Sequence, residues 1–269
     1  MTIANTTLIF DGTNLMTLAY SVRSQGLEES APPRKGGNLE IPGATGTTYL
    51  SKTYGERTIN LALWLKATGT AGGAWSAAEL GNNINRLTSL FGTDGTHTLT
   101  RTRGTQTLTS VVEVRDFRAI PGGPYHYDVN VSMVMCYPFW TSVTLTQVTI
   151  PFSSVPEVVT VNNTGTYRVE KAILTLTCGI GESITNPKFT IGSSWVQYTG
   201  TVSAGQVLTI NCGDFTATKA GSSVISSITH SPSYYCWLSI PAGSSSLTIT
   251  ASGLSNTPEL VITFYPPYL

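Results

Sequence analysis

Charged side chains are scarce in this sequence. Only 11% of the 269 residues are Asp, Glu, Lys or Arg, and 15 basic residues balance 15 acidic ones. No net field draws such a chain to nucleic acid or to an anionic membrane, so we expect no specific nucleic-acid binding and no membrane partner. The 41% of hydrophobic residues are enough for packed cores, which excludes a disordered chain.

Long apolar runs are also missing. No stretch approaches the roughly 20 apolar residues that a membrane-spanning helix needs. The N-terminal sequence MTIANTTLIFDGTN lacks a basic segment followed by an apolar core and a cleavage site. We therefore expect a soluble chain without a classical export signal.

Cysteine is rare and never closely spaced. The four cysteines form no C-x-x-C pair, so neither a zinc site nor a redox motif is supported. Each lies in a strand-like stretch, and we expect buried thiols at all four positions, Cys136, Cys178, Cys212 and Cys236.

The groups that most enzymes use are equally sparse. None of the three histidines, His97, His126 and His230, accompanies a G-x-S-x-G motif, and we expect them at the surface or at strand edges. Glu28 and Glu29 are adjacent in a loop-like stretch and are expected to be solvated. A carboxylate pair assembled only by folding stays open. We expect no enzyme, with no catalytic residue, no cofactor and no metal site.

Residues 1–145 show the patterns of a β domain with one helix. This part holds 11 of the 15 basic residues, and composition shifts between Pro138 and Pro156, which predicts a second domain at 146–269. The segment TINLALWLK alternates apolar and polar residues like a strand, as does YHYDVNVSMVMCY, and HTLTRTRGTQTLTSVVEV predicts a hairpin that turns near Gly104.

A single helix is predicted at about 76–91. Ser76 and Glu79 form a capping box, Trp75 and Leu80 occupy the hydrophobic-staple positions, and Gly92 supplies the stop. The apolar stripe consists of Leu80, Ile84, Leu87 and Phe91, so the helix is expected to pack on a sheet.

Two arginines are two residues apart, which is the spacing of side chains on one face of a strand. Arg101 and Arg103 share a face of the predicted hairpin. They can contact phosphate, but a solvated face, or pairing with acids of another subunit, is the favoured interpretation.

Residues 24–56 form a long segment with little core pattern. It combines glycines, prolines and charges, and a projecting arm or hairpin accounts for it better than a buried element.

The C-terminal half contains only short strand patterns separated by Gly, Ser, Asn and Pro. This spacing predicts an antiparallel sandwich. Its large aromatic residues are of the kind that stack on sugars, but in a small sandwich they are more often core residues; they are Trp195, Tyr198, Tyr234, Tyr235 and Trp237.

The assembled pattern resembles the distal tail (Dit) protein family of long, non-contractile-tailed bacteriophages. NNTGTYRVEKAILTLTC resembles the Asn-x-Gly opening strand of that family's galectin-like sandwich, and WLSIPAGSSSLTITASGLSNTPELVITFYPPYL resembles its closing strands, although Ser244, Ser245 and Ser246 replace the Asn usual after the turn. EIPGATGTTYLSKTYGERTINLALWL resembles its arm and first, Arg-bearing barrel strand, and the helix with LTSLFGTDGTHTLT resembles the next elements.

The resemblance implies a structural protein of the virion, at the phage tail tip. Residues 1–145 would form a β-barrel that closes into a six-fold ring, with the arm reaching a neighbour, and would bind the tail tube protein and the tail-tip hub protein. Residues 146–269 would form a galectin-like sandwich that holds receptor-binding or side-fibre proteins. Two other classes stay open: a carbohydrate-binding adhesion module, and a tail-tube or other capsid-associated β protein.

Overall fold

A computed structural model describes residues 6–17, 20–40, 42, 45, 47–48, 53–67, 76–232 and 237–269. The chain divides into two compact units, Met1–Trp140 with Leu269, and Thr141–Tyr268. The sequence placed this division between residues 145 and 146. Within the described residues, no helix has the length and apolar content needed to cross a membrane.

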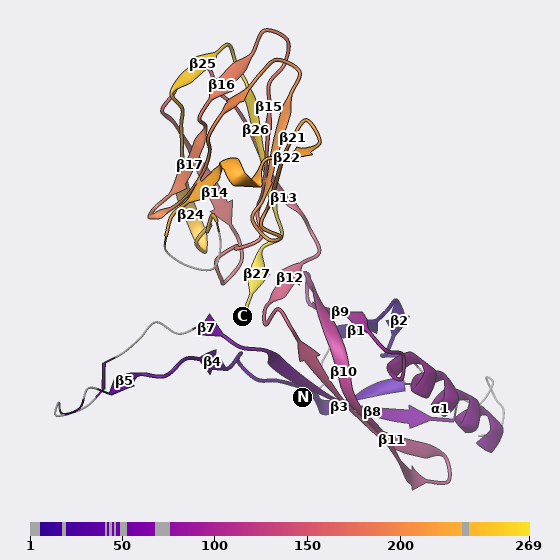
Figure 1. Cartoon of the computed structure of the whole chain (residues 1–269). Coiled ribbons are helices and arrows are strands. Elements are labelled where there is room, and N and C mark those ends of the chain that lie inside the picture. The colour runs from indigo at the N-terminus through magenta and orange to yellow at the C-terminus, as the bar shows by residue number, and fades with distance from the viewer. Residues whose placement is uncertain are drawn as a thin grey trace. The chain divides into compact units, whose positions relative to one another are not determined.

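The first unit is built on one antiparallel sheet (Figure 1). The sheet curls into a half-barrel, and its strands follow the order β2-β1-β9-β10-β11-β8-β3. These strands are β1 (Thr6–Phe10), β2 (Thr13–Asn14), β3 (Tyr20–Glu29), β8 (Arg57–Lys66), β9 (Thr96–Arg103), β10 (Gln106–Gly123) and β11 (His126–Met135). The short strands β4 (Arg34–Lys35), β5 (Leu39–Glu40), β6 (Thr47–Thr48) and β7 (Thr53–Tyr54) lie between β3 and β8, and β12 (Trp140–Ser142) follows β11.

The predicted strand periods are confirmed in this sheet. In β8, Ile59, Leu61, Leu63 and Leu65 are buried, while Trp64 and the other alternate residues face outward. The predicted hairpin is also present, because β9 and β10 pair from Thr96 to Glu113 around a turn at Gly104. The φ angle of Gly104 is +60°, in the left-handed region that glycine adopts without strain.

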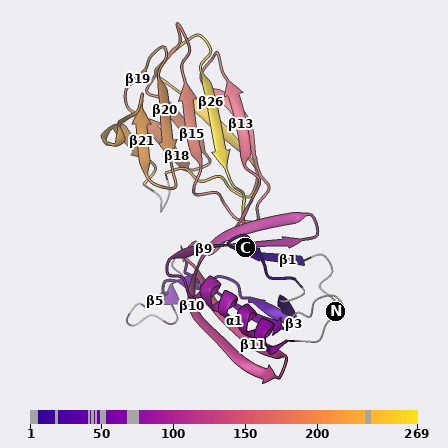
Figure 2. The same cartoon turned by 90° about the vertical axis from the view of Figure 1, so that its right-hand side faces the viewer.

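Helix α1 (Ala77–Phe91) covers the buried face of this sheet (Figure 2). The Ser76 side chain accepts a hydrogen bond from the Glu79 amide, and the Gly92 amide donates to Thr88 O at 2.8 Å, so both predicted helix ends are confirmed. Phe91 packs against Phe10, with ring centroids 4.6 Å apart. Trp75, the predicted staple residue, lies outside the described residues.

The second unit is a sandwich of short antiparallel strands. One sheet has the order β13-β26-β15-β20-β21-β22, a second has the order β14-β24-β17-β18-β23, and a small third sheet has the order β19-β16-β25. Its core includes Phe189, Leu247, Ile249 and Phe264, which are all fully buried. The elements are β13 (Thr146–Pro151), β14 (Glu157–Asn163), β15 (Ile173–Thr177), β16 (Ser183–Thr185), β17 (Lys188–Ile191), β18 (Ser194–Tyr198), β19 (Thr201–Val202), β20 (Val207–Asn211), β21 (Thr216–Lys219), β22 (Ser222–Ser223), the 3₁₀ helix η1 (Ile225–Ser227), β23 (Ile228–His230), β24 (Gly243–Thr250), β25 (Gly253–Ser255), β26 (Glu259–Phe264) and β27 (Pro267–Tyr268).

The Asn-x-Gly motif that opens the second unit has a structural role. Asn163 is 1% exposed; its Nδ2 donates to Tyr167 O at 2.8 Å, and its Oδ1 accepts from the Gly165 amide at 2.9 Å. A Cβ atom at Gly165 would lie 2.3 Å from Pro267 O. Any larger residue at 165 would therefore displace the end of the chain from this loop.

Candidate functional site

The segment between β3 and β8 is a hairpin arm (Figure 1). Two short ladders follow one another along it, β4 with β7 and β5 with β6. At its base the Gly55 amide donates to Pro33 O at 2.7 Å, and the Arg34 guanidinium lies 5.5 Å from the centre of the Tyr54 ring. The structure thus confirms a projecting hairpin within the segment predicted at 24–56, but residues 24–29 of that segment belong to β3 of the sheet.

A buried ion cluster lies where the arm joins the sheet. Arg101 on β9 donates to Glu29, the last residue of β3, and Arg103 and Arg57 approach the same carboxylate at 3.5 and 4.0 Å. The side chains of Glu29, Arg57 and Arg101 are 11, 5 and 9% exposed. The predictions that Glu29 is solvated and that Arg101 faces solvent or another subunit are therefore wrong, because both side chains point into the half-barrel.

This cluster connects two distant parts of the curled sheet. In the strand order, β9 and β3 are separated by β10, β11 and β8. Curling brings them together, and the Glu29–Arg101 contact spans the interior of the half-barrel. The Arg101 guanidinium also lies 4.4 Å from the centre of the buried Trp140 ring, which supplies a second favourable contact for the cation.

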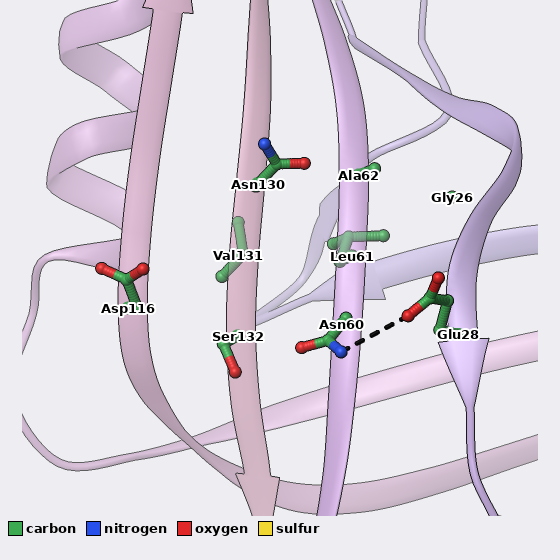
Figure 3. Close-up of a pocket in the computed structure, with 9 residues that line it drawn as sticks. All are labelled: Gly26, Glu28, Asn60, Leu61, Ala62, Asp116, Asn130, Val131 and Ser132. Atoms are coloured by element: carbon green, nitrogen blue, oxygen red, sulfur yellow. Dashed lines mark hydrogen bonds between the residues drawn. The ribbon is translucent and has the colours of Figure 1, made fainter.

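Glu28 faces the opposite side of the sheet from Glu29. It pairs in register with Asn60 on β8, which in turn lies opposite Ser132 on β11, and Ser132 lies opposite Asp116 on β10. Figure 3 shows these side chains on one face, with the Asn60 Nδ2 donating to Glu28 at 3.4 Å. They line a hollow of about 330 Å³. This row is exposed and has an acid at each end.

A bulge in β3 borders the same hollow. The pairing of β3 with β8 is interrupted between Val22 and Leu27. A Cβ atom at Gly26 would lie 2.3 Å from Ala62 O, so only glycine allows β3 to approach β8 this closely. Arg23 lies within the bulge, and Glu28 lies where the pairing with β8 has resumed.

The sheet of the first unit has two open strand edges in the part of the chain that the structure describes. β3 pairs with β8 alone, so its other edge is unpaired. β9 pairs with β10 only as far as Glu113, whereas β11 pairs with β10 as far as Gly123. Beyond Glu113, β10 therefore no longer pairs with β9 along this edge. Open edges of this kind are sites for pairing with another chain.

An aromatic hollow of about 570 Å³ lies at the other end of the exposed face. Trp64, 43% exposed, has the Arg23 guanidinium 5.9 Å and the Lys66 ammonium 5.1 Å from its ring centre. The hydrogen bond from Arg23 lowers the pKa of the Asp128 carboxyl. His126 also lines this hollow, at the start of β11.

His97 is buried, which corrects the expectation that it lies at the surface. Its Nδ1 lies 2.6 Å from Asp11 Oδ2, and its Nε2 lies 2.9 Å from Thr93 O. A carbonyl and a carboxylate only accept, so this arrangement favours the protonated imidazole, in which both ring nitrogens donate. Burial opposes that charge, but the hydrogen bonds to Asp11 and Thr93 raise the pKa of His97 above its ordinary value.

We expect this pair to make stability depend on pH. The raised pKa of His97 contributes stability that is complete below its unfolded value of 6.5 and is lost as pH rises through the folded pKa. Burial raises the pKa of the Asp11 carboxyl, but hydrogen bonds from Thr98 and His97 outweigh it and lower that pKa. The stability that Asp11 contributes is therefore present above pH 3.8, its ordinary pKa, and is lost as pH falls through the lower folded pKa. Urea unfolding from about pH 5 to about pH 9 should show declining stability, and His97→Gln should flatten that slope. An unchanged slope in the variant would contradict the assignment.

The remaining histidine and the cysteines are scattered. His230 is exposed at the end of β23. Cys178 and Cys212 are buried as expected, and burial raises the pKa of Cys178. Cys136 is exposed, which contradicts the prediction of a buried thiol, because it follows the last residue of β11. Cys236 lies outside the described residues. Nowhere in the described ranges do three or more His, Cys, Asp or Glu gather as metal ligands do.

The aromatic residues of the second unit belong mainly to its core. Tyr198 and Trp237 are 4 and 7% exposed and pack in the central cluster. Trp195 is half-buried, and the Lys188 ammonium lies 4.2 Å from its ring centre. Tyr234 and Tyr235 lie outside the described residues. Because Tyr198 and Trp237 are buried in the core, they do not form an open platform on which a sugar could stack.

A solved structure aligns with residues of both units. The Dit protein of phage SPP1, described as a paradigm of the hub adsorption apparatus in phages that infect Gram-positive bacteria, aligns with 98% of this chain and 99% of its own, at 14% identity and a TM-score of 0.71. The chain has the fold of a Dit protein. The mainly-β fold expected from the Dit resemblance is thus confirmed over nearly the whole length.

Two further structures are more distant from the Dit-like fold seen here. The phage P2 baseplate in its activated conformation, with calcium and with strontium, contains chains that align with 96% of this chain and 97% of their own at 9% identity, with TM-scores of 0.42 and 0.38. We draw no conclusion from these weaker likenesses. No family model and no curated protein matches the sequence.

Proposed function

We propose that this chain is a structural protein of a bacteriophage tail tip that assembles into a closed ring of six identical copies. The ring would connect the tail tube protein to the tail-tip hub protein, and the second unit would be a galectin-like platform for receptor-binding or side-fibre proteins. In this proposal the chain is a virion component, assembled in the host cytoplasm, and has no enzymatic activity. The observation that carries it is the match of both units together to the SPP1 Dit fold.

Features of the chain itself support assembly through the first unit. The arm projects beyond the sheet, and β3 and β10 leave open edges in the described residues. Two different edges, one on each side of the sheet, favour a head-to-tail contact, because such a contact uses unlike surfaces on the two partners. A head-to-tail contact closes into a ring when its rotation allows, and otherwise produces a filament.

Deleting residues 30–55 is expected to abolish the ring while leaving both units folded. The described ladders of the arm pair with each other, and the core strands on either side of the segment stay intact. Mass photometry and negative-stain images of the purified chain would measure the ring, and circular dichroism would measure folding.

Rings that persist after this deletion would show that the arm is not the contact. A monomeric wild-type chain with measurable glycan affinity would instead favour the carbohydrate-binding module. Open filaments would favour the tail-tube protein.

A further inference from the structure

We propose that neighbouring copies join by pairing β3 of one copy with β10 of the next, and that an ion pair between Glu28 and Arg118 sets the register of this contact. This inference rests on the proposed function, because it requires that copies of the chain meet side by side. It adds which strands meet, and which residues fix their alignment.

The directions of the two strands suit this contact. β3 is antiparallel to β8, β8 to β11, and β11 to β10. After three antiparallel steps, β3 runs opposite to β10. Copies related by rotation about an axis roughly along the strands keep these directions. The open edge of β3 therefore meets the open edge of a neighbour's β10 in antiparallel orientation, in which backbone hydrogen bonds form most favourably.

The charges at the two edges are complementary. Glu28 and Arg118 are both exposed, and Arg118 lies opposite Asn130 on the same face of the sheet as Glu28. Neither has an ion-pair partner among the described residues. Of the other nearby charges, Arg23 contacts Asp128 and Arg115 lies 3.1 Å from Glu113, whereas Asp116 has no ion pair among the described residues. Arg118 is thus the available cation, and Glu28 is an available anion at the opposite edge.

The row of residues across the sheet selects one alignment of the copies. Asp116, Ser132, Asn60 and Glu28 form one row across the sheet. If two copies met without a stagger, Glu28 of one copy would lie directly opposite Asp116 of the next. Two like charges in that position are destabilising. A stagger of two residues keeps every side chain on its face and brings Glu28 opposite Arg118 instead. A closed, curved sheet requires its strands to be staggered, so a shift of two residues is compatible with closure.

Charge reversal tests the pair directly. Glu28→Arg alone and Arg118→Glu alone should each raise the concentration at which half of the chains assemble by about tenfold or more, because each places like charges at every interface. Mixing the two variants in equal amounts should restore assembly, because alternating copies then join opposite charges at every contact. An even number of copies, such as six, permits this alternation.

Matched variants control for net charge and folding. Arg86→Glu on α1 and Glu259→Arg on β26 make the same changes in charge on exposed residues away from both edges. They should assemble like the wild type. The neutral changes Glu28→Gln and Arg118→Gln should weaken assembly by about threefold, and they provide the test should a reversed charge disturb folding.

The outcomes distinguish failure of the proposed ion pair from failure of the proposed ring. If the wild type forms rings and either reversal leaves the assembly concentration unchanged, the ion pair is wrong and the ring stands. If both reversals block assembly and the mixture stays monomeric, the two residues do not face each other. If the wild type forms no ring at any concentration, the proposed function fails, and the pair fails with it.

Discussion

Replacing Glu29 by Gln is expected to lower the free energy of unfolding of the first unit by about 3–5 kcal/mol, because removing one partner of a buried ion pair leaves uncompensated charge behind. Arg57 and Arg101 are buried around this carboxylate; Arg57 approaches it through Nη2, and its Nε and Nη1 have no hydrogen-bond partner among the described residues. Urea unfolding, with hydrogen exchange to assign each transition to a unit, would measure the loss. The second unit should unfold as in the wild type.

A double-mutant cycle gives this prediction a second measurement. Arg101→Gln should also destabilise the first unit, but the double variant should cost at least about 1 kcal/mol less than the sum of the two single changes, because the residues act as a pair. Glu28→Gln, one residue away on the exposed face, should change stability by less than about 0.5 kcal/mol. Additive effects of Glu29 and Arg101 would show that the contact does not hold the half-barrel together.

Replacing Trp237 by Ala should destabilise the second unit by about 3–5 kcal/mol, the usual cost of removing a large aromatic side chain from a core. Its ring packs edge-on against Phe215, with centroids 5.6 Å apart, and stacks near His230 at 6.2 Å. Thermal unfolding followed by circular dichroism would measure the change.

Trp195→Ala is the matched control for this change. Trp195 is only half-buried, so its loss should cost less than about 1 kcal/mol. If Trp237→Ala left stability unchanged and abolished glycan binding, the aromatic residues would be a sugar platform and the carbohydrate-binding interpretation would replace the core interpretation.

Elements governed by local periodicity were predictable from the sequence. The helix at 77–91 has a capping residue, an apolar stripe and a terminal glycine within one short window, and β8 alternates over its whole length. Both signals depend on residues close in the sequence. The segment WLSIPAG, which was expected to belong to the closing strands, forms only an isolated bridge between Ile240 and Val169.

Contacts that depend on the curl of the sheet were not predictable. Glu29 and Arg101 are separated by 72 positions, and His97 and Asp11 by 86. No local pattern marks these partners, and the adjacent charges at Glu28 and Glu29 are typical of a solvated loop. The alternation of β3 was the available signal, since two neighbouring residues of a strand face opposite sides of a sheet.

The adjacent acids at the end of β3 make the base of the arm sensitive to insertions and deletions. A slip of β3 by one residue exchanges the two faces of a strand. Leu27 precedes these two acids and Ser30 follows them, so a slip in either direction leaves a glutamate at only one of the two positions, inside beside the arginines or outside opposite Asn60. Length changes in the arm that shift β3 by one residue are therefore expected to remove one of the two carboxylates from its present contacts.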